Sequence, residues 1–204
     1  MSKTQRISEI MEQSNALPTR QTSLPASQQK MTQLLASKYG DRTAFLTTFN
    51  PDYQRQICAD VDVCFFGDFP TLSTLRAGYG NNAPVMWLVP QLYNLSEYCG
   101  VKDKLQGKPL EECAFVISTE FHYLKVSELM LFFHRFKAGR YGRFYGAVDP
   151  LIITESLRKF CEERWYSYDR HEQELREQRE AEYRRNAITH EQYLKLKKEK
   201  EADK

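Results

Sequence analysis

The chain has 204 residues, of which 41% are hydrophobic and 27% are charged, and its formal net charge is +2. This length suits one domain of ordinary size with extensions, and a charge so near zero excludes nucleic-acid binding by bulk positive charge. The apolar runs are too short to span a bilayer and the N-terminus has no apolar signal-peptide core, so we expect a cytoplasmic protein without membrane contact.

The cysteines indicate the redox compartment. Their number is odd and no two of them have C-x-x-C spacing: Cys58, Cys64, Cys99, Cys113 and Cys161. Structural disulfides and zinc sites use paired cysteines at characteristic spacings. The sequence therefore predicts buried, reduced thiols, in keeping with a cytoplasmic protein.

The N-terminal part of the chain changes character near residue 27. Residues 1–26 are rich in Ser, Thr and Gln and can bury little, which predicts a disordered tail. Residues 27–39 have an apolar face at helical spacing, with Ser27 as a cap and Gly40 as a terminator. The first helix is therefore expected there.

The next segment is ambiguous. Residues 60–66 read DVDVCFF, which alternates polar and apolar side chains as a short strand does but also suits a helical turn. Both interpretations stay open for residues 60–68. Asp68, two residues before Pro70, is expected to start a helix that runs to about Gly78.

Three apolar helices are predicted in the middle of the chain, at about residues 84–98, 109–123 and 126–137. The first contains Pro90, which should kink or split it after the first turn. The third is apolar around most of its circumference, and such a helix is packed on more than one side.

The C-terminal helix has a clear start and a charged end. Asp149 followed by Pro150 combines an N-cap acid with proline at the first helical position. Beyond Tyr168 the apolar stripe fades, and residues 169–204 carry ten basic and ten acidic residues. We expect a break near Asn186 and a restart capped by Thr189.

These elements predict an all-α fold. It should be a compact bundle of five or six helices, with a disordered N-terminal tail and a long charged C-terminal helix. The corresponding divisions are a tail at 1–26, a helical core domain at 27–168 and a charged helical extension at 169–204.

The segment from 121 to 150 is the most unusual in the chain. Eight aromatic residues fall between 121 and 146, and the run GRYGRFYG interleaves glycines with arginines and aromatic rings. Arginine binds phosphate and rings stack on unpaired bases. The predicted contact residues are Arg135, Lys137, Arg140, Tyr141, Arg143, Phe144 and Tyr145. Three interpretations stay open: a turn packed on the core, a nucleic-acid contact and a protein-docking loop.

Other motifs argue against catalysis. No lysine followed by serine or threonine completes a P-loop, and no H-E-x-x-H or G-x-S-x-G motif is present. Asp60, Asp62 and Asp68 lack the calcium-loop pattern and are better explained as caps, and His122 and His134 have no ligand partners at metal spacing. We therefore expect no enzyme activity, no cofactor and no metal.

Residues 84–164, about two fifths of the chain, resemble an uncharacterised family encoded by gut anaerobes, their phages and mobile elements. The resemblance rests on WL-x-x-QL at 87–92, SELMLFF at 127–133 and GRYGRFYGAVDP at 139–150, followed by Arg158, Phe160 and Arg164. The helix pattern is also similar to the N-terminal domains of phage helicase loaders, which bind the replicative helicase and help to place it on single-stranded DNA. Without a P-loop, this resemblance implies an ATP-independent adaptor.

The functional expectation follows from these points. The chain should be a non-enzymatic phage or mobile-element accessory protein, a helicase-loader-like adaptor in DNA replication. Its expected partners are a protein, namely the replicative helicase, and single-stranded DNA. The alternative is a structural or host-interference interaction protein that binds no nucleic acid. The oligomeric state stays open.

Overall fold

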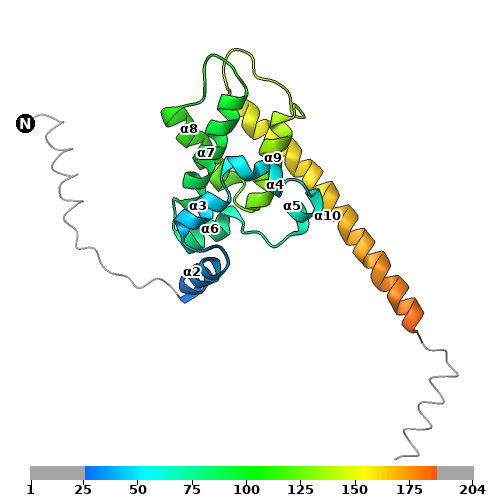
Figure 1. Cartoon of the computed structure of the whole chain (residues 1–204). Helices are drawn as coiled ribbons and strands as arrows, with labels where there is room; N and C mark the ends of the chain where they lie inside the picture. The colour runs from blue at the N-terminus through cyan, green and yellow to red at the C-terminus, as the bar shows by residue number, and fades with distance from the viewer. Residues whose placement is uncertain (1–25, 188–204) are drawn as a thin grey trace, which may run out of the picture.

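A computed structural model of the chain describes residues 26–187, and every regular element within this range is a helix (Figure 1). The only β-type pairs in the range are two isolated bridges, Thr71 with Lys125 and Asp103 with Ala147. The predicted all-α class is therefore confirmed. Among these residues no helix combines the length and the apolar character needed to cross a membrane.

The bundle begins with helix α2 (Ala26–Tyr39), which ends at Gly40, where φ is 78°. Asp41 then caps α3 (Arg42–Thr48), because its side chain accepts a hydrogen bond from the N–H of Ala44. The predicted first helix and its glycine terminator are confirmed. The predicted disordered tail lies outside the described residues, apart from Ala26.

The ambiguous residues 60–66 and the residues before them form short helices. They are the 3-10 turn η1 (Pro51–Tyr53), α4 (Gln54–Ile57) and α5 (Val61–Phe66). Asp60 caps α5, because its Oδ1 accepts hydrogen bonds from the N–H groups of Asp62 and Val63. Residues 60–66 thus form a capped helix and not a strand.

The predicted start at Asp68 is wrong, because α6 (Leu72–Tyr79) is capped by Thr71. A contact with a distant part of the chain explains the later start. The N–H of Leu72 donates to the carbonyl of Leu124 at 3.0 Å, and Thr71 before it has an extended backbone. Asp68 instead forms an exposed ion pair with Lys38 at 2.6 Å.

Helices α7 (Ala83–Tyr98) and α8 (Gly107–Glu120) pack along each other. Pro90 lies within α7, yet the helix is continuous, so the predicted split does not occur. Pro90 lies on the exposed side of the helix, whereas its neighbours Trp87, Leu88 and Gln91 are buried in the core.

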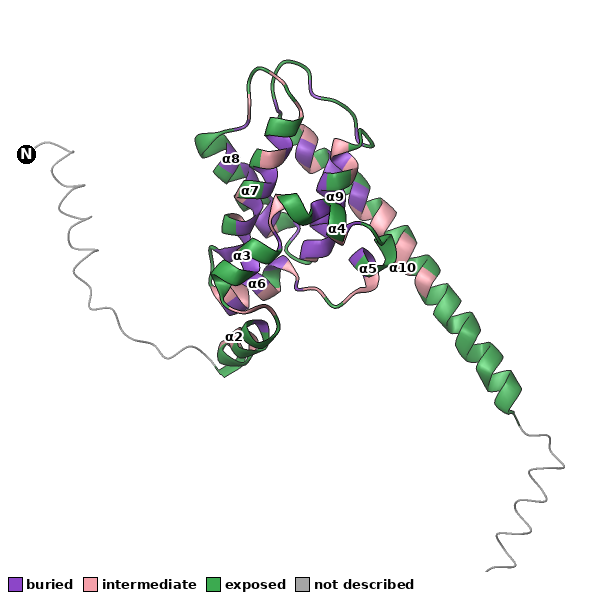
Figure 2. Ribbon diagram, in the orientation of Figure 1, coloured by how far each residue is buried: buried purple, intermediate pink, exposed green. Residues whose placement is uncertain are grey.

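Helix α9 (Val126–Lys137) lies at the centre of the bundle, in contact with α4, α5, α7 and the last helix. Nearly all its side chains are buried (Figure 2). The prediction that this helix packs on more than one side is confirmed.

Helix α10 (Pro150–Asn186) begins where Asp149 accepts a hydrogen bond from the N–H of Leu151 at 2.8 Å. Its first turns are buried against the bundle, while its far end projects into solvent (Figure 2). The end at Asn186 confirms the predicted break, whereas the restart at Thr189 lies outside the described residues. The division into tail, core and extension stays a prediction.

Candidate functional site

Most of the predicted contact residues lie in the loop that joins α9 to α10, while Arg135 and Lys137 lie in the last turn of α9. Gly139, Gly142 and Gly146 have φ values of 80°, 110° and 77°. A Cβ at any of these positions would meet nothing within 4 Å. The glycines are therefore needed for their backbone conformation rather than for close packing.

A second loop supports the first. Asp103, in the connection between α7 and α8, donates its N–H to Gly146 and accepts the N–H of Val148, at 3.1 and 3.0 Å. The two loops lie side by side at one end of the bundle (Figure 1). We call residues 101–104 and 138–148 together the loop edge.

Two of the predicted contact residues are buried. Tyr141 and Phe144 are each 8% exposed. Phe144 stacks on Phe136 with ring centroids 5.3 Å apart, and Tyr141 lies 5.5 Å from the ring of Phe132. The prediction that these two rings form a stacking surface for bases is therefore wrong, because they fill the core beside α9.

Two predicted basic residues also point into the bundle. Arg135 Nη1 lies 3.0 Å from a carboxylate oxygen of Glu163 on α10. Lys137 Nζ donates to Gln54 Oε1 at 2.7 Å and also to Asn94 Oδ1. Burial lowers the pKa of this lysine. Arg135 thus connects α9 to α10, and Lys137 connects α9 to α4 and α7. Neither side chain is a free surface cation.

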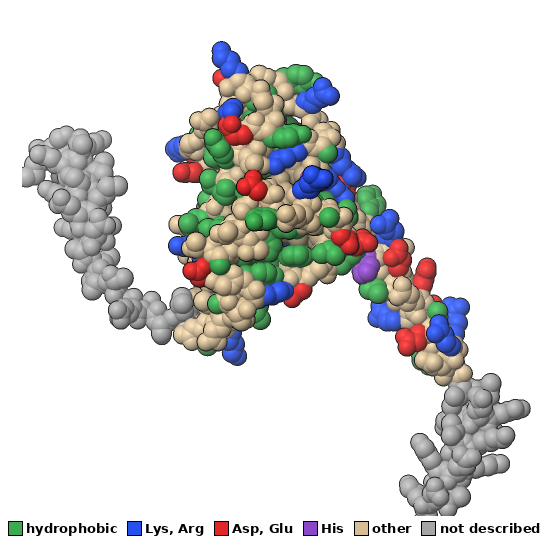
Figure 3. All heavy atoms as spheres, in the orientation of Figure 1, with side chains coloured by type: hydrophobic (Ala, Val, Ile, Leu, Met, Phe, Trp, Pro, Cys, Tyr) green, Lys and Arg blue, Asp and Glu red, His purple; other side chains and the backbone are tan. Residues whose placement is uncertain are grey.

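The remaining predicted residues face solvent. Arg140 is half exposed and pairs with Glu163 at 3.1 Å, whereas Arg143 is exposed and forms no ion pair among residues 26–187. Tyr145 is 89% exposed. Lys102, from the neighbouring loop, adds an exposed cation. Figure 3 shows basic side chains at the end of the molecule that carries both loops.

Glu163 connects the loop edge to α10. It accepts hydrogen bonds from Arg135, Arg140 and the hydroxyl of Tyr141. Burial and then the charge of Glu163 raise the pKa of Tyr141 to about 12.

This shift predicts a loss of stability at alkaline pH. The folded chain holds the Tyr141 proton above pH ~10, where the unfolded chain releases it. The resulting stability is complete below pH ~10 and is lost as the pH rises toward 12. Tyr141→Phe should therefore flatten the decline in the free energy of unfolding over this window, measured by urea denaturation at successive pH values. Tyr145→Phe, on the exposed ring of the same loop, should retain the wild-type pH profile.

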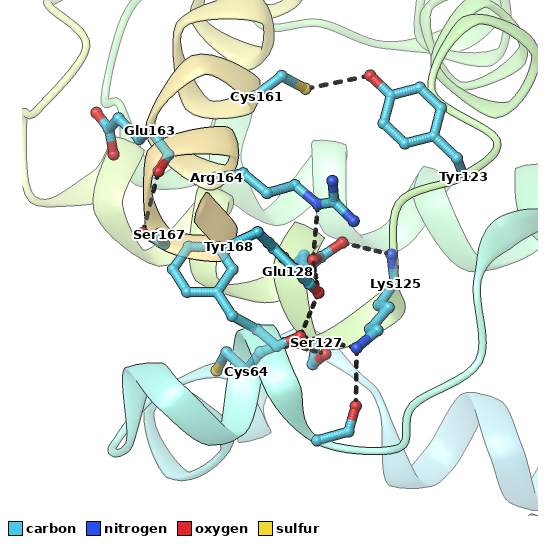
Figure 4. A network of polar contacts seen from close by, with 12 residues as sticks. Cys64, Tyr123, Lys125, Ser127, Glu128, Cys161, Glu163, Arg164, Ser167 and Tyr168 are labelled. Carbon is cyan, nitrogen blue, oxygen red and sulfur yellow. Dashed lines mark hydrogen bonds and ion pairs between the residues drawn. The ribbon is translucent and has the colours of Figure 1, made fainter. Parts of the chain in front are cut away.

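A second polar cluster was missed by the sequence reasoning. Glu128 on α9 is fully buried and accepts hydrogen bonds from Arg164 Nε at 2.8 Å, Tyr168 Oη at 2.9 Å and the N–H of Lys125 at 2.9 Å (Figure 4). The sequence did contain a signal for this cluster. Glu128 lies three residues after Lys125, which precedes the first residue of α9, and a glutamate at that position often accepts the N–H of the capping residue. Because the carboxylate is sealed from solvent and fully bonded, this cluster joins α9 to α10 and offers no reaction site.

The remaining reactive groups are the candidate metal ligands and the cysteines. Within the described range, no group of three or more His, Cys, Asp or Glu side chains could hold a metal ion. All five cysteines are free, and burial raises the pKa of Cys113 to about 11, which keeps it a poor nucleophile.

The structure also has an apolar groove that the sequence did not predict. It lies between α7 and α8 and has a volume of ≈ 620 Å³. Met86, Phe115 and Val116 line it and are exposed, with Lys108 and Glu111 at the polar margin. Exposed apolar surface of this kind is typical of a protein-binding site.

Comparisons with known proteins give one match. The sequence pattern of a family of unknown function, DUF6633, matches residues 106–204, which include α8, α9, the glycine-containing loop and α10. No curated protein matches the chain, and no solved structure does. The C-terminal half of the chain is therefore similar to a family of unknown function.

Proposed function

We propose that this protein is a non-enzymatic adaptor that binds single-stranded DNA at the loop edge and a partner protein on another surface. The main observation behind the proposal is that three basic side chains and one tyrosine ring on the loop edge are exposed to solvent. They are Lys102, Arg140, Arg143 and Tyr145.

The chemistry of these side chains suits a nucleic-acid strand. Guanidinium groups donate paired hydrogen bonds to phosphate, and an exposed tyrosine ring is a platform for a base. Arg143 has no carboxylate partner in the described part of the chain, so it loses no ion pair on binding phosphate. The buried rings of Tyr141 and Phe144 hold the loop in place beneath these groups.

Salt dependence tests the proposal. If Lys102, Arg140 and Arg143 each neutralise one phosphate, log K should fall with log salt with a slope of about −2. The double change Arg140→Ala/Arg143→Ala should weaken binding and reduce the slope to about −0.7. Fluorescence anisotropy of a labelled oligo(dT), titrated at salt concentrations from about 50 to about 200 mM, measures the affinity and its salt slope for each protein.

The matched control is Arg176→Ala/Arg184→Ala, which removes two exposed cations from the projecting part of α10. This variant should bind as the wild type does. If the wild-type protein shows no binding at the lowest salt, the nucleic-acid part of the proposal is wrong.

The partner protein in this proposal is the replicative helicase of a phage or mobile element. Its support is the similarity of the helix pattern to that of helicase-loader domains, together with the exposed groove between α7 and α8. Affinity purification from the native cell tests it. Recovery of a hexameric helicase supports an adaptor in replication, and recovery of structural proteins alone contradicts it.

The same groove favours a second candidate, a structural or host-interference protein that binds no nucleic acid. Met86, Phe115 and Val116 would then form the functional contact, and the loop edge would only connect two helices. The two candidates differ in one measurement, because only the adaptor binds oligo(dT) with a salt-dependent affinity.

A further inference from the structure

A depression lies beside the loop edge, between the end of α7 and the loop after α9. Its volume is ≈ 320 Å³, at the lower end of the range of small-molecule sites, ~300–1,000 Å³. Its lining includes the exposed Tyr98, the nearly fully buried Phe136 and Phe144, and the glycines Gly139 and Gly142.

The lining has the chemistry that a planar aromatic heterocycle requires. Tyr98 is 64% exposed, so one ring is available for contact, while Phe136 and Phe144 stack on each other on the core side. The glycines present peptide groups without a side chain, since the space where a Cβ would stand is open. Aromatic surface combined with accessible peptide groups suits a base that both stacks and forms hydrogen bonds.

The charges at the depression favour an anionic ligand. Arg143 and Lys137 both line it, and none of its lining residues is acidic. Lys137 Nζ lies 5.8 Å from the ring centre of Tyr98. Its ammonium group has three N–H donors, of which Gln54 and Asn94 accept two. A base in the depression would therefore have a cation beside it, and its phosphate would lie near Arg143.

We infer that this depression holds one unpaired base of a single-stranded nucleic acid, an inference that rests on the proposed function of the loop edge. A base within a duplex is stacked and paired, and it must be flipped out before it can enter such a pocket. The pocket thus selects single strands over duplexes, whereas the loop-edge cations alone would bind either.

Three probes of equal length test the inference with the full chain: oligo(dT), an abasic deoxyribose-phosphate oligomer and a duplex. One stacked base should make oligo(dT) bind at least about fivefold more tightly than the abasic oligomer at the same salt concentration. The duplex should also bind more weakly than oligo(dT).

Tyr98 variants locate the effect. Tyr98→Ala should reduce the preference for oligo(dT) over the abasic oligomer to the part that Tyr145 contributes, while Tyr98→Phe should keep it in full, because the ring remains. Tyr93→Ala removes another exposed tyrosine of α7 that does not line the depression, and it should behave as wild type. Circular dichroism confirms that each variant is folded.

The outcomes separate this inference from the proposed function. Equal binding of oligo(dT) and the abasic oligomer, with the expected salt slope, overturns the base pocket and leaves the phosphate contacts of the loop edge standing. A preference for oligo(dT) that is as large in Tyr98→Ala as in the wild type also overturns the pocket. Absence of binding to every probe overturns the proposed function itself.

Discussion

Arg164→Met is expected to lower the free energy of unfolding by about 3–5 kcal/mol, the usual cost of removing one partner from a buried ion pair. The substitution leaves Glu128, which is fully buried, without the guanidinium that lies 2.8 Å from its Oε1. The hydrogen bonds from Tyr168 and from the N–H of Lys125 remain, but neither donor carries a charge. Methionine keeps the apolar length of the side chain, so the loss reports mainly the unpaired carboxylate.

Urea denaturation of Arg164→Met and a matched variant measures the effect. Arg170→Met removes an arginine from the same helix, where its 3.9 Å pair with Glu174 is exposed, and should cost less than about 1 kcal/mol. Adding Glu128→Gln to Arg164→Met should recover part of the stability, because the buried group is then neutral. Equal losses for the two single variants would show that the buried pair is not important for stability.

Trp87→Ala should destabilise the fold by a similar amount, about 3–5 kcal/mol, through the cavity left in the core. The ring of Trp87 is 1% exposed, and its Nε1 donates to the carbonyl of Phe49 at 2.8 Å. That carbonyl also accepts a hydrogen bond from Gln91, so it keeps a partner after the substitution. The expected loss therefore comes mainly from packing and not from an unsatisfied oxygen.

The second tryptophan of the chain is the natural control. Trp165 is 60% exposed on α10, and Trp165→Ala should change the free energy of unfolding by no more than about 0.5 kcal/mol. Trp87→Phe should fall between the two, since it keeps a ring but leaves part of the space empty. Thermal and urea denaturation of the three variants should rank them in this order; a Trp87→Ala variant as stable as wild type would contradict the assigned core.

Local signals account for the parts of the fold that could be predicted from the sequence. Gly40 ends α2, Asp149 caps α10 and Asn186 ends it, as their positions relative to the apolar stripes indicate. The apolar circumference of residues 126–137 also predicted a central helix. Each signal is contained within a few residues, so it can be read without knowing what packs against it.

The candidate site depended on contacts between distant parts of the chain. Lys137 is bound by Gln54, 83 residues earlier, and Glu128 is bound by Arg164, 36 residues later. Tyr141 and Phe144 are buried because their rings pack against Phe132 and Phe136 of α9. The sequence left open whether these two rings contact a ligand or pack on the core, and the structure places both in the core.

By itself the sequence determined the helical class, the main helix ends and the presence of an arginine-rich, glycine-containing loop, because helix caps, turn glycines and apolar periodicity act over short stretches of chain. Only the tertiary structure decided which cations of that loop face solvent, where α6 starts, and that Glu128 is a buried ion-pair partner. Burial is a property of the whole chain, since a side chain is sealed or exposed according to residues that the sequence places far from it.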